Sequence, residues 1–163
     1  MESENSPSQF GTLLRTKILP RVQILALVVG VVGILFKIFH YAGAVEFFLI
    51  GFSTLAACYF LLAFTSVQLP PTCKPSLYSL ILYKVIYIAS AITLIGIVFA
   101  FLNLPGASQL LLSGTLTLGI ALVASAALVF SNKDNWVVLK NPLLRGIVLF
   151  VLGIYFLRSL SVI

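Results

Sequence analysis

The sequence predicts an all-α, polytopic membrane protein with about five transmembrane helices. Apolar residues make up 61% of the 163-residue chain, and charged residues only 9%. The apolar residues gather in long runs, and the prolines lie in the segments between them. A soluble domain of this length carries charge on roughly a quarter of its residues and could not cover so much apolar surface. The bilayer is therefore the expected solvent, and the length predicts a single domain.

Six segments can be assigned in order along the chain. A helix needs about 20 apolar residues to cross the hydrocarbon core, and the second to fourth apolar runs provide them. The first and fifth runs are shorter, but Lys37 and Arg158 near their ends can snorkel to the headgroups. The segments are a polar cytoplasmic N-terminal segment (1–20), a first transmembrane hairpin (21–66), a Pro-rich connector (67–76), a second transmembrane hairpin (77–131), a polar cytoplasmic loop (132–145) and a fifth transmembrane helix (146–163).

The distribution of basic residues predicts the orientation. If the N-terminus is inside, eight basic residues lie on the inner side and two on the outer side. This positive-inside bias places the N-terminus in the cytoplasm and the C-terminus outside. The inner residues are Arg15, Lys17, Arg21, Lys74, Lys84, Lys133, Lys140 and Arg145, and the outer residues are Lys37 and Arg158.

The first apolar run has a second interpretation, as a signal peptide. It has a basic flank, an apolar core and a small-residue stretch, Ala42-Gly43-Ala44, of the kind that signal peptidase cleaves. Against this interpretation, the leader before the run is long and polar. The same Gly-Ala pair also recurs after the third run, where no cleavage is expected.

That recurrence belongs to an internal repeat. Residues 26–63 align with residues 89–126 without a gap, at an offset of 63. The turn motif is Gly43-Ala44 in the first copy and Pro105-Gly106-Ala107 in the second. Each copy contains two spans, so both copies run in the same direction and are related by an axis along the membrane normal. The stretch Gly153-Ile154-Tyr155-Phe156 resembles the start of the unit, so the fifth span reads as a truncated third copy.

Small residues recur every four positions in the fourth span. Because residues four apart are neighbours on a helix, they predict a helix-packing face formed by Ser113, Thr117, Ala121 and Ser125. Such a face lets two backbones approach closely and lets hydroxyls bond across. Its partner is either another helix of the same chain or another subunit.

A charged cluster is predicted at the first hairpin turn. Lys37 and His40 are three residues apart on one helix face, and Glu46 opens the next span. Ionisable groups in or beside a span are functional candidates, here for proton relay or partner binding. A structural role is the alternative, since Glu46 at a helix N-terminus could pair with Lys37 and pin the hairpin. The second copy favours that alternative, because uncharged residues replace all three, namely Ala100, Asn103 and Gln109.

Several classes of function are not supported. The two cysteines, Cys58 and Cys73, have no further ligand at metal-binding spacing, so we expect no metal and no cofactor. The basic residues form no stripe with interleaved aromatics, so we expect no nucleic-acid partner. No catalytic constellation is present, and an intramembrane enzyme would have to be built around His40 and Glu46. The expected partners are the lipid bilayer and either other membrane proteins or a second copy of the chain.

The segment Gly33-Ile-Leu-Phe-Lys-Ile-Phe-His-Tyr-Ala-Gly-Ala44 resembles the first hairpin of the GldL family. The family segment reads roughly G-A-L-F-K-I-x-H-W-P-G-A; here Tyr41 and Ala42 replace its Trp-Pro, and Pro105 restores the proline in the second copy. The resemblance covers each two-helix unit, from residue 26 to residue 130. It implies a location in the bacterial inner membrane, because GldL is the membrane subunit of the gliding-motility and type 9 secretion motor of Bacteroidetes.

The resemblance also implies what this chain lacks. The family motor is thought to use proton flow through a Glu in a pattern like L-x-T-E-A, but this sequence reads Phe52-Ser-Thr-Leu-Ala56, with Leu55 in place of the acid. The second copy, Leu116-Thr-Leu-Gly119, also lacks it. We therefore predict a non-enzymatic structural or partner-binding protein. The alternative is a small transporter or channel with a polar path between the repeats, although no Asp, Glu or His lies deep in any span.

Overall fold

The computed structural model describes residues 18–65, 76–131 and 133–160, and in these ranges every regular element is a helix. All five helices contain a stretch that is long and apolar enough to cross a membrane, which confirms the predicted fold class. The helices are α2 (Leu19–Ile38), α3 (Ala44–Phe64), α4 (Leu77–Phe101), α5 (Ala107–Ser131) and α6 (Lys133–Ser159). Nearly all of the predicted N-terminal segment and Pro-rich connector lies outside the described residues.

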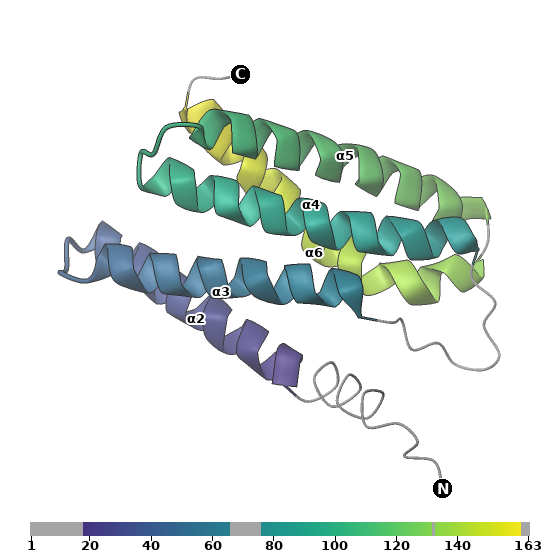
Figure 1. Ribbon diagram of the computed structural model, residues 1–163, viewed down its shortest axis with the longest axis horizontal. Helices are drawn as coiled ribbons and strands as arrows, with labels where there is room; N and C mark the ends of the chain where they lie inside the picture. Colours follow the sequence, from purple (N-terminus) through teal and green to yellow (C-terminus); the bar gives the residue numbers. More distant parts are fainter. Residues whose placement is uncertain (1–17, 66–75, 132, 161–163) are drawn as a thin grey trace, which may run out of the picture. The chain divides into compact units, whose positions relative to one another are not determined.

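The chain forms two compact units, Met1–Cys58 and Tyr59–Ile163. The described part of the first unit is the hairpin of α2 with most of α3 (Figure 1). The second unit contains the end of α3 together with α4, α5 and α6, which lie side by side. Each hairpin has a short turn at one end, between residues 38 and 44 in the first and between residues 101 and 107 in the second.

Glycines allow close packing in the first hairpin. Gly33 lies against the backbone of Phe48, and Gly51 lies against the backbone of Gly30, so that neither glycine has room for a Cβ. The ring of Phe52 covers Gly30, where an added Cβ would lie 2.7 Å from the ring. Phe52 in turn stacks on the fully buried Phe48, with ring centroids 4.4 Å apart. The two helices therefore meet backbone to backbone, as small residues permit in membranes.

The second unit adds a third helix to the same arrangement. Gly96 lies against the backbone of Leu111, and Gly114 lies against Thr93. Helix α6 packs on this pair, because Gly146 approaches Ile86 of α4 as well as two leucines of α5. Leucine and isoleucine side chains fill the core of this unit. Those with almost no exposed surface are Ile86, Leu94, Ile97, Leu111, Leu118, Leu139 and Leu157.

Helix α6 corrects one sequence prediction. Residues 132–145 were expected to form a polar loop, but α6 begins at Lys133 and carries Pro142 in its interior. Its span starts at Val138 rather than at residue 146. The reason is that the apolar residues between the charges recur at helical spacing and pack inward. Their buried members are Val138, Leu139, Pro142 and Leu143.

Candidate functional site

The two hairpin turns share one backbone design. Helix α2 ends at a left-handed residue, His40, with φ 56°, and α4 ends at Asn103, with φ 54°. A glycine follows three positions later in each turn, Gly43 with φ 86° and Gly106 with φ 85°. A left-handed residue after the last helical turn is typical of the Schellman cap. The Ala42-Gly43-Ala44 stretch is therefore part of a hairpin turn in the structure.

The hydrogen bonds of the two caps also correspond at the offset of 63. In the first turn the Tyr41 N–H donates to the Phe36 carbonyl at 2.8 Å, and in the second the Leu104 N–H donates to the Phe99 carbonyl at 2.9 Å. The inner bonds, from His40 to Lys37 and from Asn103 to Ala100, are both 3.2 Å long. These are the two bonds that define the Schellman cap.

The contacts between α2 and α3 also correspond to those between α4 and α5 at the offset of 63. The contact of Gly33 with Phe48 is matched by that of Gly96 with Leu111. The contact of Gly51 with Gly30 is matched by that of Gly114 with Thr93. Each of these residues is displaced by 63 positions from its counterpart, so both hairpins pack in one register.

The structure brings Lys37, His40 and Glu46 to the turn end of the first hairpin. Lys37 is in the last turn of α2, and Glu46 is in the first turn of α3. All three side chains are exposed. Exposed aromatic rings accompany them, because Phe39 and Tyr41 expose more than 60% of their surface. An ion pair between Lys37 and Glu46 remains a prediction.

The side chains of the second hairpin turn lack the charges of those in the first turn. Asn103 and Gln109 are exposed and uncharged, and Ala100 is buried. His40 and Asn103 share a left-handed backbone conformation in which histidine, asparagine and aspartate are enriched among residues other than glycine. The first turn therefore presents a cation, an imidazole and a carboxylate on the backbone that in the second turn presents only amides.

The structure buries only part of the predicted helix-packing face within the chain. Ala121 and Ser125 are buried, whereas Ser113 and Thr117 are exposed. The reason is geometric, since a step of four residues advances about 40° beyond a full turn and three steps rotate the row by about 120°. The hydroxyls of Ser113 and Ser125 donate to carbonyls of their own helix, those of Leu110 and Ala121.

A tyrosine cluster in the second unit was not predicted. The rings of Tyr83 and Tyr87 lie 4.8 Å apart, and the ring of Tyr59 lies 5.8 Å from Tyr87. All three are buried, and a side-chain hydrogen bond joins Tyr83 to Tyr87. Arg145 of α6 interacts electrostatically with Tyr87, consistent with the packing of the next residue, Gly146, on Ile86.

Arg145 lies within the fifth span, because the span starts at Val138. It lies seven residues, or about 10 Å along the helix, from the start of this candidate span, and its side chain is exposed. Because residues 132–145 were predicted to form a loop, Arg145 was not expected to lie within a span. The helical spacing of Val138, Leu139 and Leu143 and the i, i+4 pair of Tyr83 and Tyr87 were the signals that could have revealed it.

The residues that the structure describes provide no evidence for a metal site or for a reactive thiol. Within them, no group of three His, Cys, Asp or Glu side chains could hold a metal ion. Cys58 is a buried free thiol in α3, and Cys73 lies outside the described residues.

These helices define a polytopic α-helical integral membrane protein in contact with the lipid bilayer. Residues 22–76 match the family model of the GldL N-terminal domain. The match contains most of α2, all of α3 and the connector, about a third of the chain, and it confirms that the first transmembrane hairpin is GldL-like. No curated protein and no solved structure gives a significant match to the chain.

Proposed function

We propose that the protein is a non-enzymatic scaffold of the bacterial inner membrane that binds other membrane proteins or a second copy of itself. The observation that carries the proposal is the GldL-like hairpin built twice on one backbone plan, with a leucine where the family pattern has its acid. The matching caps and crossings of the two hairpins support a duplication.

The position of Leu55 argues for a structural role. Leu55 has only 5% of its surface exposed, and its counterpart Leu118 has none. Both copies therefore place a buried aliphatic side chain where the resemblance implies a proton-carrying carboxylate. Apolar packing at this position stabilises the hairpin but offers no group that could exchange a proton.

The first hairpin turn is the proposed binding surface. It combines the charges of Lys37 and Glu46 with the exposed rings of Phe39 and Tyr41. Aromatic residues contribute large contact areas at interfaces, and charges on the rim select the partner. The second turn has the same backbone without these groups, which makes it a matched internal control.

The test is affinity purification from the native membrane after chemical cross-linking, with quantitative mass spectrometry. The triple variant K37A/H40A/E46A should lose at least tenfold of a specific cross-linked membrane protein. The control variant N103A/Q109A should retain that protein. Equal recovery with both variants would refute the binding surface, and proton conduction by the purified protein in liposomes would refute the scaffold role.

The alternative function, a small transporter or channel, is favoured by Arg145 and the buried tyrosines within the spans of the second unit. Intramembrane charges often mark ion or substrate pathways. This alternative predicts solute flux in proteoliposomes that is abolished by R145Q and reduced by Y87F. Flux no greater than in empty liposomes would exclude it for the solutes tested.

A further inference from the structure

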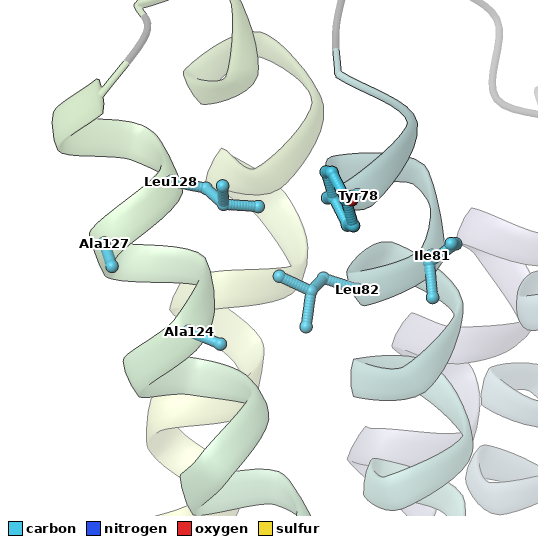
Figure 2. A pocket seen from close by; sticks show the side chains of 6 residues that line it. All are labelled: Tyr78, Ile81, Leu82, Ala124, Ala127 and Leu128. Atoms are coloured by element: carbon cyan, nitrogen blue, oxygen red, sulfur yellow. The ribbon is translucent and has the colours of Figure 1, made fainter.

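A third helix packs on the second hairpin at a defined place. Helix α6 contacts both α4 and α5, and Figure 2 shows it beside them at the end where an apolar groove opens between the two. Gly153 of α6 lies between Thr93 and Thr115, because a Cβ on this glycine would lie 3.2 Å from the Thr93 methyl carbon and would overlap that of Thr115. Gly146, seven residues earlier on the same face, also approaches both helices. We term the place between Thr93 and Thr115 the third-helix site.

The two threonines suit the close approach of a helix backbone. Both are buried, and their hydroxyls donate to carbonyls of their own helices, Thr93 to Ala89 at 2.9 Å and Thr115 to Leu111 at 2.6 Å. The hydroxyl groups are therefore satisfied, and the methyl groups lie nearest to Gly153. Small side chains of this kind let membrane helices pack closely.

The first hairpin carries a different pair of residues at the corresponding positions. At the offset of 63, Gly30 corresponds to Thr93 and Phe52 to Thr115. A Cβ on Gly30 would lie 2.7 Å from two carbons of the Phe52 ring, so the ring covers this position. In the second hairpin the Thr93 side chain extends from the same position toward Gly153. The Phe52 ring therefore lies where the third helix would have to enter.

A phenyl ring and a helix backbone cannot share this place. Both hairpins cross in one register, so the space between positions 30 and 52 corresponds to the third-helix site. The first hairpin fills this space with its own side chain, which stacks on the fully buried Phe48. Because protein interiors leave few voids, the ring would have to leave before a helix could enter.

We propose that Phe52 closes the first hairpin to a third transmembrane helix, so that α6, from the same chain or from a second copy, docks only on the second hairpin. The excluded partner is a membrane helix with two glycines seven residues apart on one face. This inference is independent of the binding surface proposed at the first hairpin turn, which uses other residues of that hairpin.

The first measurement displaces α6 from the second hairpin of the full-length chain without native cysteines. A disulfide between I86C and G146C reports docking, because a Cβ at position 146 would lie 3.4 Å from Cγ2 of Ile86, a distance that a disulfide can bridge. T93G/T115F, which copies the first hairpin, should lower the disulfide yield at least fivefold. L116F places the same ring at the exposed neighbouring position and should leave the yield unchanged.

The second measurement opens the first hairpin. The donor copy is the displaced variant of the first measurement with G146C as its single cysteine. The acceptor copy carries Q23C, at the position of the first hairpin that corresponds to the reporter on α4. An acceptor with G30T/F52T should form at least fivefold more disulfide-linked dimer than an acceptor with the native pair. An acceptor with L25C, on an exposed face of α2, should form only background dimer with either pair.

Three results would overturn the proposal. The first is an unchanged disulfide yield in T93G/T115F, and the second is an equal loss in L116F. The third is an equal yield of dimer from acceptors with and without Phe52. The third result decides the role of Phe52 even where the donor variant is less stable than the wild type, because both acceptors meet the same donor.

Discussion

Substitution of Gly51 by alanine is the most informative perturbation of the first hairpin. A Cβ at this position would lie 2.6 Å from the Cα of Gly30 and 2.7 Å from the carbonyl oxygen of Ala26. Both neighbours are backbone atoms of α2 and cannot rotate away. The helices must therefore separate at their crossing.

The size of the effect follows from these distances. Carbon atoms pack best at about 3.5–4.0 Å, so the helices must move apart by about 1 Å. Such overpacking costs about 1–3 kcal/mol. The gain in helix propensity from glycine to alanine offsets about 1 kcal/mol of this. We expect G51A to lower the free energy of unfolding by up to about 2 kcal/mol.

The equivalent variant of the second hairpin should have a smaller effect. A Cβ on Gly114 would lie 2.8 Å from the Thr93 nitrogen and 3.0 Å from its Cα, so less movement is needed. G119A is the matched control, because its nearest neighbour is the ring of Phe150, which can rotate.

The assay is reversible unfolding by sodium dodecyl sulfate in mixed micelles, followed by far-ultraviolet circular dichroism. The expected order of stability is G119A, then G114A, then G51A. If G51A unfolded at the same denaturant fraction as G119A, the backbone-to-backbone crossing would be wrong.

Three further predictions concern single side chains. L55E places a carboxyl group at a buried position in the membrane and should cost about 3 kcal/mol, seen as a lower midpoint of thermal unfolding; an unchanged midpoint would contradict the burial of Leu55. G43A and G106A should each cost about 1 kcal/mol in the same measurement, because the strain arises from their positive φ and not from neighbours; a cost at only one of them would contradict the shared turn. Y87F removes the hydrogen bond to Tyr83 and should cost about 0.6 kcal/mol, whereas Y78F at the exposed rim of α4 should leave stability unchanged.

The sequence was sufficient to predict the number of spans and the positions of the two hairpin turns. Long apolar runs define membrane helices because every backbone polar group must be paired inside the bilayer. The Gly-Ala motif located both turns because Gly43 and Gly106 adopt left-handed conformations that few other residues accept. The placement of Lys37, His40 and Glu46 at one turn follows from these two features alone.

Features that depend on packing could not be predicted in this way. The drift of an α-helix turns the row from Ser113 to Ser125, so the chain itself buries only two of its four residues. The charges of residues 132–145 indicated a loop, although the structure begins α6 at Lys133 and places Arg145 within a candidate span. The position of the Phe52 ring over Gly30 depends on the distance between α2 and α3, which sequence periodicity does not contain.

The central claim is that both hairpins cross the membrane in the same direction, and the most direct test is the accessibility of single cysteines to a membrane-impermeant maleimide. In a C58A background that retains Cys73, labelling of intact cells is compared with labelling of opened membranes; Y41C and L104C are each tested with Cys73 replaced by alanine. The account predicts that positions 41 and 104 react from the outer side and that Cys73 reacts only after the membrane is opened. Reaction of positions 41 and 104 from opposite sides would contradict it.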